Sequence, residues 1–417
     1  MTKWPLLPPS SLTDVWSLGA ARTAAATAAG SSFAAIHAHG SVTTWGRLDY
    51  GGDCGSVQGQ LKDVQKIQSS SNAFAAILAD GSVVTWGDSE GGGDSSAVRE
   101  KLVNVQQIQS SGLAFAAILS SGCVVTWGFD NDGGDSSAVQ GQLRNVQHVQ
   151  SSTYSFAAVL ADGSVVTWGD GGYGGDSSDV QHKLQNVQQI QSSCTAFAAI
   201  LADGSVVTWG APEYGGDSSA VQEQLQHVQQ IQACERAFAA ILADGSVVTW
   251  GDPLSGGDSS SVQEQLRDVQ QIQHSDFAFA AILANGSVVT WGNPGCGGDS
   301  TAVQEQLQSV QQIKASRAAF AAILADGSVV TWGHSLYGGD SRAVQDQLRH
   351  VRGIQSSAFA FAAILADGSV VTWGHKCGGG DSSDVRSQLQ KVPSRKRPHS
   401  EATGTDSLYI RQACDLQ

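Results

Sequence analysis

Nine aspartates recur at intervals of 41 residues and form the most regular set of ionisable groups in the chain. They are Asp53, Asp94, Asp135, Asp176, Asp217, Asp258, Asp299, Asp340 and Asp381. A ring of carboxylates could bind a cation or a basic peptide. Aspartate before Ser-Ser is also well suited to an Asx turn or a helix N-cap, where it accepts hydrogen bonds from local N–H groups. The sequence favours this structural role, and cation binding stays an open alternative.

Three short motifs resemble ligand sites but lack essential parts of them. Residues 169–174 read GDGGYG, which fits a dinucleotide-binding pattern, yet no complete βαβ unit surrounds them. Residues 129–135 read FDNDGGD and lack the spacing and terminal glutamate of a calcium loop. His37 and His39 lie on one side of an expected strand with no third ligand nearby. We therefore expect no metal site and no cofactor.

The chain also lacks the residue patterns of common catalytic sites. G-x-S-x-G, H-E-x-x-H and paired C-x-x-C motifs are absent from the sequence. Seven cysteines are an odd number at uneven spacing, which suggests occasional substitutions in a reducing compartment rather than a disulfide framework. We expect a protein that is not an enzyme.

The charge balance restricts the classes of partner. Against 23 Lys and Arg stand 38 Asp and Glu, so the net charge is −15. That field repels nucleic acid and anionic membranes and favours a basic protein partner. Apolar runs are far shorter than the roughly 20 residues of a spanning helix, and the N-terminus does not resemble a signal peptide. The sequence predicts a monomer in the cytoplasm or, if the basic PSRKRPH segment at residues 393–399 directs import, in the nucleus.

Tryptophan spacing reveals an internal repeat that covers most of the chain. Nine tryptophans, 41 residues apart, are expected to be structural anchors: Trp45, Trp86, Trp127, Trp168, Trp209, Trp250, Trp291, Trp332 and Trp373. We divide the chain into an N-terminal tail with a divergent start at 1–24, a nine-repeat array at 25–393, and a basic then polar tail at 394–417.

One repeat, residues 187–227, shows what each unit forms. FAAIL and SVVTW are short β-rich runs joined by Ala-Asp-Gly, which predicts a hairpin with a type I′ turn. VQQIQ is the expected first strand, and Ser219 with Gln222 predicts an N-cap for one helical turn in the connector. The hairpin is apolar on both faces, so each unit needs neighbours on both sides. We predict an all-β β-propeller of nine three-stranded repeats, with an open superhelical array as the alternative.

The first repeat lacks an obvious first strand. Residues 23–32, TAAATAAGSS, match the pattern poorly, whereas LQKV at residues 389–392 lies in the right register to be the missing strand. The sequence therefore suggests that the C-terminus completes the first blade as a clasp.

The repeat resembles that of the regulator of chromosome condensation family, and the most specific part of the resemblance is DGSVVTWG. The resemblance spans all nine copies. The short three-strand period is more similar to the compact propeller of a β-lactamase inhibitory protein than to the longer blades of the nuclear exchange factor. The family's glycine after the first strand and its histidine at the start of the second are replaced by Ser70 and Ala73. The resemblance implies a propeller and, as an alternative function, an accessory domain of a ubiquitin-ligase or guanine-nucleotide-exchange assembly.

Two places vary freely between copies: the turn after the first strand and the four-residue loop after Trp-Gly. In a three-stranded meander both places lie on the same side, opposite the uniform Asp-Gly turns. Aromatic residues and arginine are the types that anchor interfaces. Those at the variable places are Tyr50, Tyr154, Tyr173, Tyr214, Arg236, Phe277, Arg317, Tyr337 and Phe359. We predict a protein-binding scaffold that uses these residues, with a lectin-like propeller as a third alternative.

Overall fold

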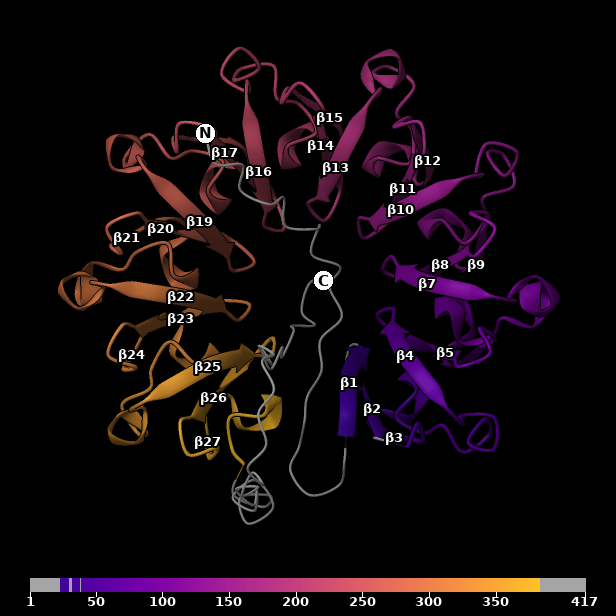
Figure 1. Cartoon of the computed structure of the whole chain (residues 1–417), viewed down its shortest axis with the longest axis horizontal. Helices are drawn as coiled ribbons and strands as arrows, with labels where there is room; N and C mark the ends of the chain where they lie inside the picture. Colours follow the sequence, from indigo (N-terminus) through magenta and orange to yellow (C-terminus); the bar gives the residue numbers. More distant parts are fainter. Residues whose placement is uncertain (1–22, 30–31, 38, 383–417) are drawn as a thin grey trace, which may run out of the picture.

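Nine three-stranded antiparallel sheets, one for each repeat, are arranged around a common centre in the computed structural model (Figure 1). We call these sheets blades 1 to 9 in chain order. The structure describes residues 23–29, 32–37 and 39–382. The first strand of each blade runs from the rim toward the centre, as β7 and β22 show in Figure 1. The predicted all-β propeller of nine three-stranded repeats is confirmed.

Each sheet pairs its strands in chain order, the second strand lying between the first and the third. The first strands are β1 Thr23–Ala29, β4 Val64–Ser69, β7 Val105–Ser110, β10 Val146–Ser151, β13 Val187–Ser192, β16 Val228–Ala233, β19 Val269–His274, β22 Val310–Ala315 and β25 Val351–Ser356. The second strands are β2 Ser32–His37, β5 Ala73–Leu78, β8 Ala114–Leu119, β11 Ser155–Leu160, β14 Ala196–Leu201, β17 Ala237–Leu242, β20 Ala278–Leu283, β23 Ala319–Leu324 and β26 Ala360–Leu365. The third strands are β3 Val42–Gly46, β6 Val83–Gly87, β9 Val124–Gly128, β12 Val165–Gly169, β15 Val206–Gly210, β18 Val247–Gly251, β21 Val288–Gly292, β24 Val329–Gly333 and β27 Val370–Gly374.

Short helical turns occupy the loops after Trp-Gly and several connectors between blades. In the loops these are η1 Leu48–Tyr50, η2 Ser89–Gly93, η4 Asp130–Asp132, η5 Gly171–Tyr173, η7 Pro212–Tyr214, η8 Pro253–Ser255, η10 Pro294–Cys296, η12 Ser335–Tyr337 and η14 Lys376–Gly378. In the connectors they are η3 Ser96–Lys101, η6 Gln181–Lys183, η9 Gln263–Gln265, η11 Thr301–Gln306 and η13 Gln345–Gln347. In the repeat at 187–227, for which the sequence predicts the connector helix, the connector forms only a hydrogen-bonded turn, in which the Val221 N–H donates to the Ser218 carbonyl at 3.0 Å. Ser219 is not an N-cap there: its own N–H donates to Asp217 Oδ1 at 2.8 Å.

The Asp-Gly hairpin turn differs from the predicted type I′. Gly204 has a φ of 80°, whereas Asp203 is not in the left-handed region that a type I′ turn requires at both central residues. The Gly204 N–H donates to the Leu201 carbonyl, and the Leu201 N–H donates to the Ser205 carbonyl, both at 2.9 Å. This is a three-residue turn with glycine at the bulge position. The Asp203 carboxylate stabilises it by accepting the Ser205 N–H at 2.9 Å.

The hydrophobic core lies between blades rather than inside them. At the interface of blades 6 and 7, Ala239 and Ile241 of β17 pack against Phe279 and Trp291 of the next blade. Phe279 and Trp291 stack on each other with ring centroids 5.3 Å apart. The same arrangement recurs between each pair of consecutive blades. Because every blade buries one apolar face on each neighbour, the units are stable only as a stack.

One tryptophan of the nine departs from the expected structural role. Eight are 3–5% exposed, whereas Trp45 in blade 1 is 42% exposed.

The prediction that the C-terminus completes blade 1 as a clasp is wrong. The first strand of blade 1 is β1, which pairs antiparallel with β2 so that Ala26 lies opposite Ala35. Small residues are compatible with this pairing because a ladder uses only backbone groups. Residues 389–392 lie outside the described residues.

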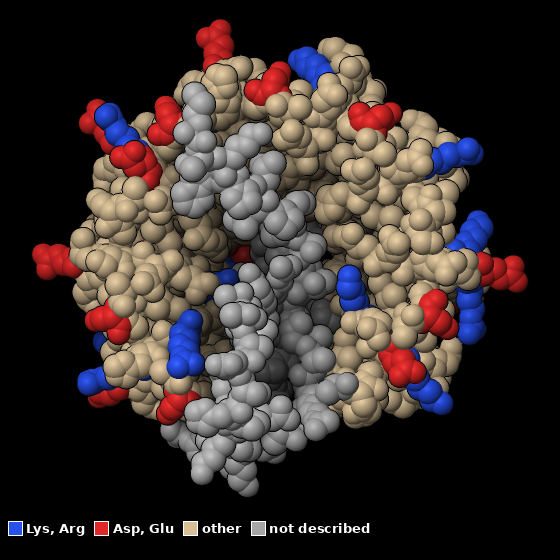
Figure 2. Space-filling view, viewed as in Figure 1, with Lys and Arg blue, Asp and Glu red and all other residues tan. Residues whose placement is uncertain are grey.

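Figure 2 shows the same side of the molecule with charged residues gathered mainly around the outer rim. The connectors at the rim carry Arg99, Glu100 and Lys101, among others. The band between rim and centre is mostly uncharged, because glutamines dominate the exposed positions of the first strands. Within the described residues, no helix has the length and apolar character needed to cross a membrane.

Candidate functional site

The turns that follow the first strands form a continuous hydrogen-bonded belt around the centre. The Thr153 N–H donates to the Cys194 carbonyl, and the Cys194 N–H donates to the Glu235 carbonyl, both at 2.9 Å. Equivalent bonds of 2.7–3.1 Å join all the turns from Ser71 to Ala358. We call these turns, together with the loops after Trp-Gly, the inner edge. Their backbone is held from blade to blade, although their side chains vary.

In blades 2 to 9 the two variable places of each repeat lie against each other at the inner edge, as the meander predicts. In blade 4 the Asp170 N–H, at the start of the loop after Trp-Gly, donates to the Tyr154 carbonyl in the turn at 3.0 Å. The Ser155 hydroxyl donates to the Tyr173 carbonyl at 2.7 Å. Side chains from both segments therefore project from one rigid edge.

Tyr154 and Tyr173 form the first cluster on this edge. Their ring centroids are 5.0 Å apart, and the two side chains remain 38% and 39% exposed. The carboxylate of Asp132, from the preceding blade, is buried beside Tyr154 and adds negative charge there. Burial, with repulsion from Asp170, raises the pKa of Asp132 to about 6. The cluster thus combines exposed aromatic surface with a carboxyl that titrates near neutral pH.

Arg236 links two aromatic rings in the second cluster. Its guanidinium lies 5.2 Å from the ring centroid of Tyr214 in blade 5 and 5.5 Å from that of Phe277 in blade 7. Both distances fall within the range of cation–π attraction. Arg236 itself is exposed, so this group bridges three blades while presenting its charge to solvent.

Arg317 connects the carboxylates of two other blades in the third cluster. Its Nε donates to Asp276 Oδ2 at 2.7 Å, and one terminal nitrogen lies 3.8 Å from Glu235 Oε1. Burial, together with the charge of Asp276, raises the pKa of Glu235 to about 7, although Arg317 partly opposes the shift. Asp276 and Glu235, which lie 41 and 82 positions before Arg317 in the sequence, thus form one ionic cluster with it.

The fourth cluster contains two more of the predicted residues. Tyr337 and Phe359 have ring centroids 5.5 Å apart. His334 packs edge-on against Tyr337 at 5.0 Å, and His375 lies 6.2 Å from Phe359. Each cluster includes residues from neighbouring blades. Eight of the nine predicted residues occupy blades 4 to 9. We call these eight the aromatic arc: Tyr154, Tyr173, Tyr214, Arg236, Phe277, Arg317, Tyr337 and Phe359.

Tyr50, the ninth predicted residue, is separate from the aromatic arc. It lies in blade 1 under Arg47, whose guanidinium is 4.0 Å from its ring centroid. The turns of blades 2 and 3, between Tyr50 and the arc, carry Asn72 and Leu113. The inner edge is therefore asymmetric around the ring.

Sequence reasoning missed Glu235, Asp276 and Asp132 as members of these clusters. All three occupy the same variable places as the predicted residues. They are absent from the prediction because it includes only aromatic residues and arginine. Their position in the repeat was the available signal.

The aspartate ring has the structural role that its sequence context favours. Asp94 Oδ1 accepts the Ser96 N–H at 2.8 Å, and Asp176 Oδ1 accepts the Ser178 N–H at 2.9 Å. These backbone bonds hold the pKa of both carboxyls below the usual range. His37 and His39 stack on each other and bond Thr43 and Ser41, respectively. No group of three potential metal ligands occurs in the described part of the chain.

The GDGGYG segment also has a local structural explanation. Asp170 Oδ1 accepts the Gly172 N–H at 2.9 Å and caps the helical turn η5. Tyr173 ends that turn at the inner edge. The segment thus has the same conformation as the loops of other blades.

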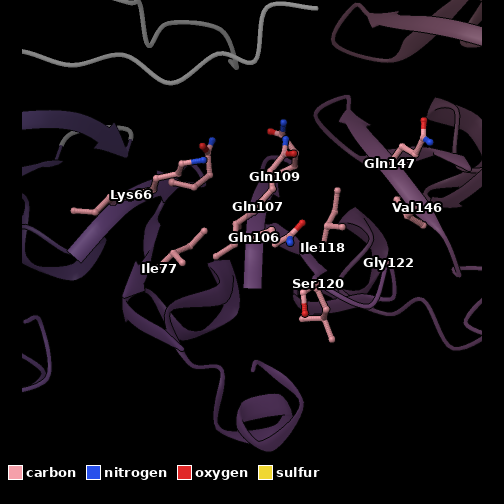
Figure 3. A pocket seen from close by; sticks show the side chains of 14 residues that line it. Lys66, Ile77, Gln106, Gln107, Gln109, Ile118, Ser120, Gly122, Val146 and Gln147 are labelled. Atoms are coloured by element: carbon pink, nitrogen blue, oxygen red, sulfur yellow. The ribbon is translucent and has the colours of Figure 1, made fainter. Parts of the chain in front are cut away.

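A cleft of about 490 Å³ lies between the first strands of blades 2, 3 and 4 (Figure 3). Glutamines on neighbouring strands, including Gln107, Gln109 and Gln147, line it together with Lys66 and Ile118. Amide side chains can donate and accept hydrogen bonds but do not act as an acid–base pair. The cleft therefore provides a surface of amide and apolar side chains that also carries the positive charge of Lys66.

No protein-family model matches the sequence, and no curated protein matches it. Similar solved structures include the computationally designed Ika8 protein, at 13% identity and a TM-score of 0.35, over 87% of this chain and 99% of that chain. The CRINKLY WD40 ectodomain of an Arabidopsis thaliana receptor kinase is 15% identical with a TM-score of 0.33, over 63% of this chain and 93% of that chain.

Prp20p from Saccharomyces cerevisiae, described as the yeast RCC1, is 15% identical with a TM-score of 0.34, over 66% of this chain and 72% of that chain. Structural neighbours thus include RCC1 and RCC1-like propellers at low identity, and the likeness is one of fold only.

Proposed function

We propose that this protein is a non-catalytic scaffold that binds a protein partner through the aromatic arc of the inner edge. The observation that supports the proposal most directly is the contrast between a fixed backbone and varied side chains. The hydrogen-bonded belt holds the turns from Ser71 to Ala358 in one register. A rigid edge loses little conformational entropy when a partner binds, so side-chain differences can specify that partner.

The chemistry of the arc is suited to protein recognition. Tyrosine, phenylalanine and arginine are enriched at the energetic centres of interfaces. The chain's net charge of −15 favours a basic partner in the cytoplasm or nucleus. The nine loops after Trp-Gly are dissimilar and give little support to a lectin-like propeller, which would be expected to repeat one sugar site in each blade.

The test is a quantitative pull-down from cell extract with the full chain and two variants. The arc variant carries Tyr154→Asn, Arg236→Asn, Phe277→Asn and Phe359→Asn. Blade 2 has Asn72 at this turn position, so asparagine is compatible with the backbone. The control variant carries Gln106→Ala, Gln188→Ala, Gln229→Ala and Gln270→Ala at exposed positions of the first strands.

We expect partners that the natural chain and the control variant retain and the arc variant loses. Retention of the same partners by both variants contradicts the proposal. If the lost partner is a GTPase or a ubiquitin-ligase subunit, the protein acts as an accessory domain of such an assembly. Circular dichroism checks that both variants fold.

A further inference from the structure

The eight formed blade interfaces share a contact that the ends of the array lack. In blade 9 the Trp373 indole Nε1 donates to the Gly338 carbonyl of blade 8 at 2.9 Å, and the preceding interfaces repeat this bond. The same sequence offset around the ring would pair Trp45 of blade 1 with Gly379 of blade 9. In the described part of the chain, Trp45 donates no such bond and is 42% exposed.

The receiving site on blade 9 is preserved but open. Gly379 has a φ of 96°, like its counterpart Gly338 at 94°. A Cβ placed on Gly338 would lie 2.5 Å from the Phe361 ring, whereas one placed on Gly379 meets no atom of the described residues within 4 Å. Val370 on the same face is half-buried, although its counterpart Val329 is 1% exposed. Blade 9 therefore carries a copy of the surface that is covered at every other interface, and the described residues leave this copy more exposed.

Blade 1 keeps only part of the matching surface. Phe33 and Trp45 stack at 5.4 Å, as their counterparts do in the other blades. Thr43, however, takes the place of Val84 opposite the second-strand alanine, and Ala26 takes the register position of Ile67. Threonine in place of valine reduces the apolar surface that blade 1 can bury, so an interface formed by blade 1 is weaker than the other eight.

We infer that the ring closes by docking the Trp45 face of blade 1 on the Gly379 face of blade 9, and that this ninth interface is the weakest joint of the ring. The occupant is the chain's own first blade because the two faces carry the two halves of a contact made eight times elsewhere. The ends of the array also face each other across the seam in Figure 1. Linkage within one chain gives this contact a high effective concentration compared with a second copy.

The joint would let the ring open and close without unfolding a blade. This inference is independent of the proposed function, because it concerns the seam and not the aromatic arc. Residues at the seam therefore test it without altering the turns of blades 4 to 9.

Hydrogen exchange of the tryptophan indole N–H groups, followed by ¹H–¹⁵N NMR on the full chain, measures closure. Loss of one signal in Trp45→Phe assigns Trp45. We expect its indole to exchange faster than those of the eight buried tryptophans but slower than a free indole. Thr43→Val should slow it about tenfold by restoring the apolar contact, and Val370→Thr should accelerate it to the free rate.

Val125→Thr is the matched control, since it places threonine at the position equivalent to Thr43 in the interface of blades 2 and 3. It should leave the Trp45 rate unchanged. The inference is overturned if Trp45 exchanges as slowly as the buried tryptophans, or if Thr43→Val does not slow it. Protection that increases with protein concentration would instead identify a second copy as the occupant. The other indole signals report that each variant is folded.

Discussion

The indole Nε1–H of Trp209 donates a 3.0 Å hydrogen bond to the carbonyl oxygen of Gly174, which belongs to the preceding blade. Trp209 also stacks on Phe197 of its own blade with ring centroids 5.1 Å apart. The repeated tryptophan thus joins each blade to its neighbour by both apolar packing and one directed bond.

Removal of this side chain should destabilise the array strongly. Trp209→Ala should lower the free energy of unfolding by about 3–5 kcal/mol, because it leaves a cavity between two blades. Trp45→Ala is the matched control and should cost less than about 1 kcal/mol, since Trp45 is 42% exposed. Urea denaturation monitored by circular dichroism measures both. Equal costs would contradict the assigned difference in burial.

The glycine that follows the inner-edge loop of blade 5 should tolerate no side chain. Gly215 has a φ of 97°, and an added Cβ would lie 2.4 Å from the Phe238 ring. Gly215→Ala should therefore cost at least about 1–3 kcal/mol through backbone strain and displacement of the aromatic ring. Gly141→Ala places its Cβ in open space and should be nearly neutral. Thermal unfolding of the two variants distinguishes these outcomes.

Glu235 should make stability depend on pH. Its folded-state pKa of about 7 lies above the value of about 4.3 for an unfolded glutamate, so the folded chain binds more protons between these values. Its contribution to stability therefore falls as pH rises from about 4 to about 7 and stays low above that range. Glu235→Gln should raise the free energy of unfolding at pH 8 by about 1–2 kcal/mol and flatten the profile. Denaturation at pH 5 and pH 8 tests this, and an unchanged profile would refute it.

A buried serine bond also joins neighbouring first strands. The Ser151 hydroxyl donates to the Ser110 carbonyl of the preceding blade at 2.7 Å, and Ser151 is 2% exposed. Ser151→Ala should cost about 1 kcal/mol, the usual net value of such a bond. Blade 6 has Ala233 at this position, so the variant should still fold. The urea midpoint provides the measurement, and a cost above about 3 kcal/mol would show a larger role.

The cysteine thiols should differ in reactivity according to burial. Burial raises the pKa of Cys234 to about 12, so little thiolate forms at pH 8. Cys123 in the Gly-Cys hairpin turn is partly exposed. Iodoacetamide should modify Cys123 in the folded protein and reach Cys234 only after unfolding. Peptide mass spectrometry after a timed reaction measures both, with urea-unfolded protein as the reference.

Local patterns in the sequence predicted most of the blade. The 41-residue period, the two apolar runs around Asp-Gly and the regular tryptophans specify three strands because side-chain alternation and turn chemistry act within one repeat. The shared side of the two variable places also followed, since strand direction alternates in a meander. The turn type did not follow, because Asp203 stabilises a turn in which only Gly204 is left-handed.

Contacts between blades were decided by the tertiary structure. Arg317 pairs with Asp276 and approaches Glu235 because stacking brings equivalent turn positions of successive blades side by side. Backbone pairing also makes residues 23–29 a strand, although their side chains match the repeat poorly. Trp45 has nearly the same local sequence as its eight counterparts, with VTTWG in place of VVTWG, yet it is exposed, because the other eight are buried by the preceding blade and blade 1 has none before it in the chain.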